Sequence, residues 1–267
     1  MAQIPPPAGA ARLVPLLRAA GCVYAEEEAA LLLAGAADEA GLERMLADRM
    51  AGLPLELVLG WAEFCGLRLR VAEGVFIPRR RTELLARLAV RELAVRPAAV
   101  VVDLCCGAGP VSAVLAQRTD AAQILAVDIE AAAVACARSN LETRAAVFRG
   151  DLFTPLPAAL RGRVDLISAN APYVPTGRLG TLPAEARLHE PAVTHDGGTD
   201  GLAVLSRIAE QAKAWLAPSG VLLLECAADQ VRPLAKAAAT AGLLPSVRRR
   251  TAAEATVLRC TAGPASG

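Results

Sequence analysis

The stretch Val100-Val-Val-Asp103-Leu-Cys-Cys-Gly107-Ala-Gly109-Pro110 decides the fold of this chain. Its run of valines and Leu104 predicts a strand that is buried on both faces. Gly107 and Gly109 permit the backbone angles of a tight turn and a close approach to a ligand. Pro110 suits the first position of a helix, whose amino terminus offers unpaired N–H groups to an anion. The stretch therefore predicts a strand, a turn and a helix in that order.

Strands and helices alternate on both sides of this stretch. Expected strands cover residues 100–104, 124–128, 146–149, 164–169, 221–225, 246–250 and 256–260. Expected helices cover residues 84–96, 110–118, 131–140, 201–215 and 231–241. Such alternation is typical of an α/β fold with a mostly parallel sheet. The last two strands are close enough in sequence to form a hairpin, so we expect one antiparallel strand.

The first 78 residues show two other patterns. From residue 12 to residue 60, apolar residues recur at helical spacing between glycines. Between Trp61 and Ile77 the apolar period changes to two, which predicts a β-hairpin. We therefore expect a helical amino-terminal domain over residues 1–60, a linking hairpin over residues 61–78 and an α/β domain over residues 79–267.

Composition narrows the classes of function. The chain has 267 residues, of which 54% are hydrophobic and 21% charged, as in ordinary globular proteins. A net charge of +1 and an aromatic content of 3% weigh against a surface that binds nucleic acid directly. Because the sequence has neither a signal-peptide pattern nor an apolar run of about 18 residues, we expect a cytoplasmic location without membrane attachment.

Cysteine and histidine do not suggest a metal site. The seven cysteines are irregularly spaced and form no CxxC pair, and the chain has only two histidines, His189 and His195, for which we predict no role. Free cysteines in apolar segments suit a reducing cytosol. The adjacent Cys105 and Cys106 are therefore interpreted as packing residues of the glycine turn.

Acidic residues follow the next two strands. Asp128 ends the second strand about 20 residues after the glycine turn, where a carboxylate can accept hydrogen bonds from both ribose hydroxyls. Asp151 follows the third strand and suits either an adenine amino group or a helix cap. The three-glycine dinucleotide pattern is absent, because Gly109 is followed by Pro-Val-Ser. The order of elements favours a nucleoside site without a pyrophosphate.

The fourth strand ends in Asn170-Ala-Pro-Tyr173. Proline stops the strand ladder, so an amide side chain, a carbonyl and an aromatic ring come together at the carboxyl end of the strand. Ligands bind beyond such strand ends in open α/β sheets. Taken alone, this stretch suits a surface turn as well as a ligand site.

Together these residues resemble the HemK/PrmC family of class I S-adenosylmethionine-dependent methyltransferases, which methylate the side-chain amide of a glutamine in translation release factors. The resemblance covers about residues 50–260. It extends beyond the glycine turn and the acids to Pro54-Leu-Glu-Leu-Val-Leu-Gly60, Glu63-Phe64, Gly74-Val-Phe-Ile-Pro78-Arg79, Thr82-Glu83, His189-Glu190-Pro191, Asp196-Gly-Gly198, Asp200-Gly201 and Leu223-Leu-Glu225. It implies a Rossmann-like seven-stranded sheet with a small amino-terminal helical domain and a linking hairpin.

The resemblance also implies a role for each site residue, with S-adenosylmethionine as cofactor and a release factor or another glutamine-bearing protein as partner. The implied catalytic residues are Asn170, Ala171, Pro172 and Tyr173. The implied cofactor-binding residues are Asp103, Cys105, Gly107, Gly109, Asp128, Ile129, Asp151, Leu152 and Asn170. The implied substrate-binding residues are Phe76, Pro78, Arg79, Thr82, Asn170, Pro172, Tyr173 and Glu190.

The family's chemistry requires a fixed acceptor nitrogen, because the lone pair of an amide nitrogen is delocalised. The Asn170 oxygen and the Ala171 carbonyl would accept the two amide hydrogens, and Tyr173 would pack against the amide. Holding the nitrogen in line with the sulfonium methyl group is catalysis by positioning and local electrostatics.

The chain departs from the family pattern at three places. Ala171 replaces the first proline of the motif, Cys105 replaces the first glycine of the turn, and Arg80 and Arg81 replace a proline and a glutamate. These departures keep open an amino methyltransferase of nucleic acid or of a small molecule. A catalytically idle relative that binds a translation factor is the non-enzyme alternative.

Overall fold

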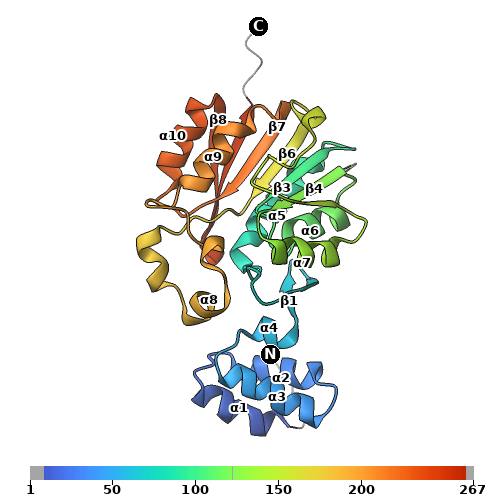
Figure 1. Ribbon diagram of the computed structural model, residues 1–267, viewed down its shortest axis with the longest axis vertical. Helices are drawn as coiled ribbons and strands as arrows, with labels where there is room; N and C mark the ends of the chain where they lie inside the picture. Colours follow the sequence, from blue (N-terminus) through green and yellow to red (C-terminus); the bar gives the residue numbers. More distant parts are fainter. Residues whose placement is uncertain (1–8, 122, 263–267) are drawn as a thin grey trace.

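The computed structural model describes residues 9–121 and 123–262. These residues form a seven-stranded sheet with the strand order β5-β4-β3-β6-β7-β9-β8 (Figure 1). The strands are β3 (Val100–Leu104), β4 (Gln123–Asp128), β5 (Ala146–Arg149), β6 (Val164–Ala169), β7 (Leu216–Glu225), β8 (Leu243–Arg250) and β9 (Ala255–Ala262). Strand β9 runs antiparallel to both β7 and β8, which confirms the predicted hairpin and its one antiparallel strand.

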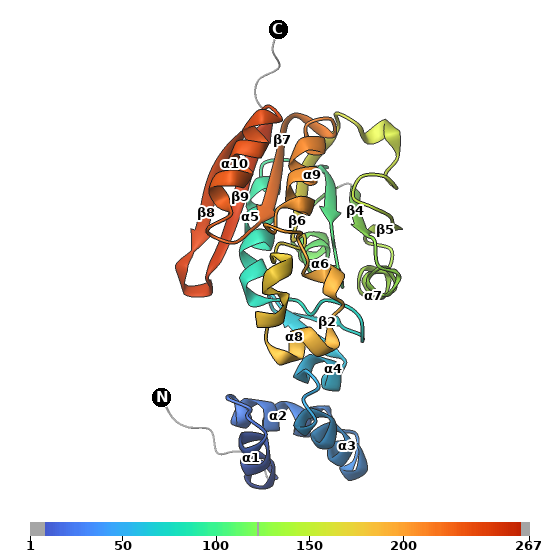
Figure 2. The same ribbon diagram turned by 60° about the vertical axis from the view of Figure 1, so that its left-hand side comes forward.

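Helices cover both faces of the sheet (Figure 2). Helices α5 (Glu83–Leu93), α6 (Pro110–Arg118) and α7 (Ala131–Leu141) share a core cluster with Val101 and Leu166. Helices α9 (Ala203–Ala212) and α10 (Val231–Thr240) share the opposite cluster with Val102 and Ile167. Successive strand residues thus point to opposite cores, as the pleat of a sheet requires. The predicted α/β class is confirmed.

The amino-terminal helices have a hydrophobic core of their own. They are α1 (Ala10–Ala19), α2 (Ala25–Gly35), α3 (Glu39–Met50) and α4 (Leu55–Leu59). Leu13, Leu17 and Leu32 lie fully buried in this core. Arg49 of α3 pairs with Glu185 at 2.6 Å, which joins the helices to the rest of the chain. The division of the chain into domains at residues 60 and 78 stays a prediction.

A short antiparallel hairpin follows these helices. Its strands are β1 (Trp61–Phe64) and β2 (Leu67–Arg70). The extension of the hairpin to residue 77 was wrong, because residues 71–79 form turns and irregular backbone. Val75 and Ile77 are buried in loop packing, so their alternation reflects burial without strand pairing.

A compact segment between β6 and α9 has no counterpart in the sequence-based prediction. It contains two 3₁₀ turns, η3 (Thr176–Thr181) and η4 (Ala192–Thr194), and the short helix α8 (Ala184–His189). The expected helix at residues 201–215 is shorter, because Trp215 lies in the core just before β7 begins. Elements of three to six residues lack the periodicity that reveals longer helices.

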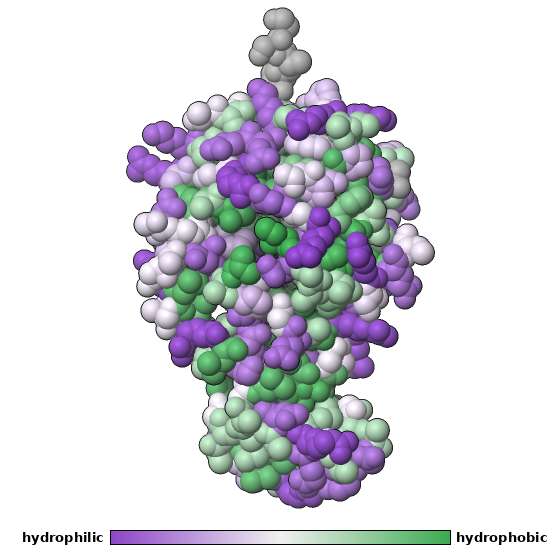
Figure 3. Space-filling view, in the orientation of Figure 1, coloured by the Kyte–Doolittle hydropathy of each residue, from purple (hydrophilic) through white to green (hydrophobic). Residues whose placement is uncertain are grey.

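On the face seen in Figure 3, apolar residues gather near the middle and at the narrow junction with the amino-terminal helices. Arg248, Arg249 and Arg250 are exposed on β8, one of the two edge strands of the sheet, where their charges oppose pairing with another strand. Over residues 9–121 and 123–262, no helix has the length and apolarity needed to cross a membrane.

Candidate active site

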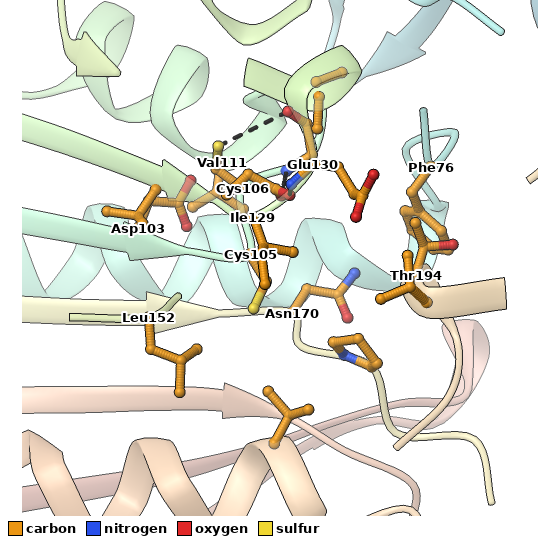
Figure 4. A pocket seen from close by; sticks show the side chains of 18 of the residues that line it. Phe76, Asp103, Cys105, Cys106, Val111, Ile129, Glu130, Leu152, Asn170 and Thr194 are labelled. Carbon is orange, nitrogen blue, oxygen red and sulfur yellow. Dashed lines mark hydrogen bonds between the residues drawn. The ribbon is translucent and has the colours of Figure 1, made fainter. Parts of the chain in front are cut away.

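The carboxyl ends of β3, β4, β5 and β6 border a cavity of about 260 Å³ (Figure 4). Of the predicted site residues, those that line it are Phe76, Pro78, Arg79, Thr82, Asp103, Cys105, Gly107, Asp128, Ile129, Asp151, Leu152, Asn170 and Pro172. In Figure 4, Asn170 lies between Asp103 and Leu152 on one side and Phe76 and Thr194 on the other. The sheet thus brings residues from four strand ends and the segment before α5 to one place.

Four predicted residues do not line the cavity. Gly109 immediately precedes α6, and a Cβ there would lie 3.1 Å from Leu141, so its small size allows α6 to pack against α7. Ala171 is 2% exposed and lies in the core. Tyr173 and Glu190 also lie outside the cavity lining: Tyr173 bonds Glu225, and Glu190 bonds Ile77 and the cavity residue Arg79.

Asp103, near the end of β3, is a buried carboxylate with 2% of its surface exposed. Its Oδ2 accepts hydrogen bonds from the Ser112 hydroxyl at 2.7 Å and the Ser112 N–H at 3.2 Å, and its Oδ1 accepts from the Ser168 hydroxyl at 2.8 Å. Burial raises the pKa of Asp103 to about 6, although these hydrogen bonds act in the opposite direction. Asp103 therefore ties α6 and β6 to β3 as well as lining the cavity.

Asp128 holds the glycine turn from the end of β4. Its Oδ2 accepts from the Gly107 N–H at 2.8 Å and its Oδ1 from the Glu130 N–H at 2.9 Å. Burial raises the pKa of Asp128, and the two backbone N–H groups oppose that rise. Because each oxygen has a second lone pair, the carboxylate can still accept two hydrogen bonds from a ligand.

Asp151, after β5, forms an ion pair that the sequence did not suggest. Its Oδ2 lies 2.5 Å from Arg207 Nη2, and both side chains are about half exposed. Arg207 and Val204 both line the cavity from α9, three residues apart on one helical face. The helical spacing of this region predicts that residues 204 and 207 share one face of α9. The sequence does not indicate that this face borders the cavity.

Asn170 follows β6 and contacts the segment before α5. Its Nδ2 donates to the Thr82 hydroxyl oxygen at 3.3 Å. Among the residues that the structure describes, none donates a hydrogen bond to Asn170 Oδ1 or to the carbonyl of Ala171. The two oxygens that the family's chemistry requires are therefore left without protein partners.

Tyr173 points away from the cavity. Its hydroxyl donates to Glu225 Oε1 at 3.2 Å, and the Arg81 guanidinium lies 5.7 Å from its ring. Gln230 Nε2 donates to the Tyr173 carbonyl at 2.8 Å. Burial raises the pKa of the Tyr173 hydroxyl. The predicted packing of Tyr173 on the substrate amide stays a prediction.

Glu190 is buried between two loops. Its Oε1 accepts from the Ile77 N–H at 3.1 Å and from Arg79 at 2.5 Å. Its Oε2 lies 2.8 Å from His195 Nε2, but the angles between the two groups do not form a hydrogen bond. His195 also packs edge-on against Phe76, with ring centroids 5.4 Å apart. His195, to which the sequence assigned no role, is thus a buried contact of this cluster.

Cys105 has an unusual backbone for a residue with a side chain. Its φ of 54° lies in the left-handed region that glycine favours. Burial raises the pKa of its thiol, so the sulfur is not a thiolate nucleophile. Over the described residues, no group of histidine, cysteine and acidic side chains is arranged to hold a metal ion.

Sequence reasoning also missed one wall of the cavity. Val193, Thr194 and Asp196 line it from the segment between β6 and α9. Residues 196–198 belong to the Asp-Gly-Gly part of the resemblance, which was the available signal.

Comparison with known proteins agrees with this architecture. Residues 66–186 match a family model described as the methyltransferase small domain. Among solved structures, a ribosomal protein L11 methylase from Lactobacillus delbrueckii subsp. bulgaricus superposes with a TM-score of 0.52. It is 19% identical and covers 72% of this chain and 83% of its own, so the likeness concerns the fold.

Curated relatives are more similar in sequence. A release factor glutamine methyltransferase from Geobacter sulfurreducens is 38% identical over 189 residues, which are 70% of this chain and 65% of that protein. A 4-amino-L-phenylalanine/4-methylamino-L-phenylalanine methyltransferase from Streptomyces pristinaespiralis is 38% identical over 183 residues, 66% of this chain and 62% of that protein. The chain thus spans less than two thirds of the length of these two relatives.

A third relative matches along most of its length. The release factor glutamine methyltransferase of Cereibacter sphaeroides is 36% identical over 249 residues, 86% of this chain and 88% of that protein. Its match extends well beyond the region of the family model. On this similarity and on its class I methyltransferase fold, the chain belongs to the release factor glutamine methyltransferase family, HemK/PrmC.

Proposed function

We propose that this protein transfers a methyl group from S-adenosylmethionine to the side-chain amide nitrogen of a glutamine in a release factor. The observation that carries the proposal is the pair of unpartnered oxygens on Asn170 and Ala171 at the carboxyl end of β6. Both are hydrogen-bond acceptors, and a primary amide presents two hydrogens to such a pair. A release-factor partner and a cytoplasmic location belong to the same proposal, and direct contact with nucleic acid does not.

The residues around the cavity fit the cofactor. Asp128 retains a lone pair on each oxygen for the ribose hydroxyls, and Asp151 stands at the next strand end for an amino group. Gly107 leaves open space beside the turn. A Cβ at this position would enter that space, because its nearest neighbour would be the Phe76 carbonyl oxygen at 4.0 Å. When bound, S-adenosylmethionine supplies an electrophilic methyl group on a sulfonium.

The protein's contribution to catalysis is to hold the acceptor nitrogen. Asn170 Oδ1 is not among the buried unpartnered atoms, so it is open to the cavity that the side chain lines. Hydrogen bonds from the amide to this oxygen and to the Ala171 carbonyl would fix the plane of the amide and draw electron density towards its nitrogen. Positioned acceptors of this kind supply much of an enzyme's rate enhancement.

One relative suggests a second kind of methyl acceptor. The Streptomyces protein, as similar as the release-factor enzymes, is named for an arylamine substrate, 4-amino-L-phenylalanine. An aromatic amine is also planar and presents two hydrogens to Asn170 and Ala171. The exposed Arg80 and Arg81, which depart from the family pattern, would attract the carboxylate of such an amino acid.

The test is a methylation assay with isotope-labelled S-adenosylmethionine and either a purified release factor or 4-amino-L-phenylalanine, with mass spectrometry to locate the label. We expect label on a glutamine of the Gly-Gly-Gln loop. Asn170→Ala should lower turnover by about 10²-fold or more, while calorimetry shows S-adenosylhomocysteine binding within about threefold of the wild type. Gln117→Ala, an exposed amide on α6, is the control and should keep full activity.

The outcomes separate the candidates. Label on the amino acid alone would replace the protein substrate with the small molecule. Absence of label on both acceptors, with the cofactor product bound normally, would reject the proposed function. Equal losses of turnover and cofactor affinity in Asn170→Ala would mean that Asn170 serves the cofactor rather than the acceptor.

A further inference from the structure

Exposed arginines gather on one side of the methyltransferase sheet, next to the cavity but outside its lining. They come from two parts of the chain, η1 (Arg80–Thr82) with the helix α5 that follows it, and the edge strand β8. We call this set the arginine surface, and its members are Arg80, Arg81, Arg87, Arg91, Arg248 and Arg250. The transfer of a methyl group to a protein, as proposed above, assigns them no part.

One carboxylate joins the two parts of the arginine surface. Arg250 Nη1 of β8 lies 3.9 Å from Glu83 Oε2 at the start of α5, and Arg87 Nη2 donates to the same oxygen at 2.9 Å. Arg87 and Arg250 therefore lie on either side of one acid. Arg91 is exposed one helical turn after Arg87, on the same face of α5.

A second ion pair shows how β8 lies along α5. Glu92, in the last turn of the helix, pairs with Arg259 of β9 at 2.7 Å, and Arg259 is the register partner of Ser246 on β8. The strand thus runs back along α5 from its last turn to its first (Figure 2). Arg248 lies between these two ends, on the same face of β8 as Arg250, because side chains two residues apart share a face.

The acids near the arginine surface do not neutralise it. Glu83 is shared by two of the arginines, and the buried Glu225 lies 3.6 Å from Arg81. Over residues 9–121 and 123–262, the members without an acidic partner within 4.0 Å are Arg80, Arg91 and Arg248. Because the whole chain has a net charge of only +1, this surface is a local concentration of positive charge.

Protection of the sheet edge explains only part of this charge. Arginines on β8 oppose pairing with another strand, but α5 is a helix and has no strand edge to protect. Arg87 and Arg91 are nevertheless exposed on the side of α5 that faces Arg250. A negatively charged partner that covers α5 and β8 together accounts for both groups of arginines.

The place of the arginine surface favours the substrate protein as that partner. Arg80 and Arg81 belong to it, and the next residue, Thr82, lines the cavity. A protein whose glutamine enters a cavity of about 260 Å³ keeps most of its own surface outside, against the residues around the cavity. Guanidinium groups pair with carboxylates through two parallel hydrogen bonds, which fixes orientation as well as attracting charge.

We propose that the arginine surface binds acidic side chains of the protein that carries the acceptor glutamine. This inference rests on the proposed function and adds to it the chemistry of the substrate around the glutamine. Nucleic acid is also negatively charged, but the arginine surface has no aromatic member on which a base could stack. Attraction between exposed charges of this kind speeds association and selects the partner.

The test uses the full-length protein with S-adenosylhomocysteine bound and a purified release factor as the probe. The double variant Arg91→Glu with Arg248→Glu reverses two charges without breaking an ion pair among the described residues. The matched control is Arg144→Glu with Arg163→Glu. These two exposed arginines precede β5 and β6, at the opposite ends of the strands from the cavity.

We expect the Kd for the release factor to rise about tenfold in the double variant, because two attractions become repulsions. In turnover, KM should rise by about the same factor while kcat stays within about twofold. The neutral variant Arg91→Gln with Arg248→Gln should raise the Kd by about threefold. The control and the affinity for S-adenosylhomocysteine should stay within about twofold of the wild type.

Salt provides a second readout. Raising the salt concentration should weaken the binding of the release factor to the wild type more than to the double variant, because screening acts on exposed charges. Equal salt dependence in both, or a rise in Kd as large in the neutral variant as in the reversed one, would overturn an electrostatic role for these arginines.

A labelled single-stranded oligonucleotide, followed by fluorescence anisotropy, tests the other class of partner. We expect it to bind more weakly than the release factor. Tighter binding of the oligonucleotide that is lost in the double variant, with the Kd for the release factor unchanged, would assign the surface to nucleic acid and overturn the proposal.

The two proposals fail differently. Binding of the release factor that depends on the arginine surface, without methylation of the bound protein, would reject the proposed function and keep the surface. Methylation with the same KM in the wild type and in the double variant would keep the proposed function and overturn the surface. Absence of any binding of the release factor to the wild type would also overturn the surface.

Discussion

Replacing Glu190 with alanine should destabilise the protein, because this carboxylate is buried and has three contacts. It is 5% exposed and joins the loop of residues 71–79 to the loop after α8. The substitution removes the acceptor of the Ile77 N–H at 3.1 Å, the partner of Arg79 at 2.5 Å and the neighbour of His195 at 2.8 Å. Alanine also leaves a cavity where the side chain stood.

The size of the effect follows from which partners remain buried. Ile77 is 2% exposed, so its N–H group loses its acceptor away from water, at a cost of about 1–3 kcal/mol. The Arg79 side chain is 32% exposed and can turn towards water, so its loss contributes less. The lost contact with the buried His195 adds a smaller cost to the free energy of unfolding. We expect a loss of about 2–4 kcal/mol in the free energy of unfolding.

The assay is urea unfolding followed by the fluorescence of Trp61 and Trp215. The matched control is Glu26→Ala, which removes an exposed carboxylate paired with Arg18. That pair is solvated on both sides, so its loss should change the unfolding free energy by no more than about 0.5 kcal/mol. A loss below about 1 kcal/mol in Glu190→Ala would refute the view that the buried contacts of Glu190 hold the two loops together.

Two other predictions follow from the same structure. Because burial raises the folded-state pKa of Asp103 from an ordinary 3.8 to about 6, this residue's contribution to stability is fully present below pH 3.8 and is lost as pH rises to about 6. Denaturation at several pH values should show this loss, of the order of 3 kcal/mol, in the wild type but not in Asp103→Asn; equal slopes in both would contradict it. Gly201→Ala should lower stability by about 2 kcal/mol or more and reduce kcat, because its Cβ would lie 2.3 Å from the Tyr173 carbonyl. Gly162→Ala, at a similar positive φ of 70° but with open space around it, measures the backbone strain alone, and a loss as large as that of Gly201→Ala would exclude the steric explanation.

Long periodic elements and strand ends were accessible from the sequence. The valine run at residues 100–102, Asp128 at the end of β4 and Asp151 just after β5 placed one side of the cavity, because parallel strands bring their carboxyl ends to one edge. The short elements at residues 176–194 were not accessible. Elements of three to six residues carry no period, and the contacts that hold them, such as Glu190 with Ile77, span 113 residues of sequence.

Pairs between side chains of distant segments could not be predicted from the sequence either. Asp151 was interpreted as a ligand acceptor or a cap, yet it pairs with Arg207 from a helix 56 residues away. Tyr173 was placed against the substrate by the family resemblance alone, which did not indicate that its hydroxyl bonds Glu225. Sequence position identifies which residues arrive at a strand end, whereas the direction of each side chain depends on partners from other strands.

The alanine at position 171 shows how tertiary contacts can replace a local constraint. Proline there would restrict the backbone of the unfolded and folded chain alike. In this protein the Ala171 methyl group is buried in the core, and Pro172 restricts the backbone that precedes it. Gln230 then binds the Tyr173 carbonyl at 2.8 Å and the Gly201 carbonyl at 3.2 Å. Core packing, Pro172 and the Gln230 contacts thus hold the backbone around the Ala171 carbonyl in place of the missing proline.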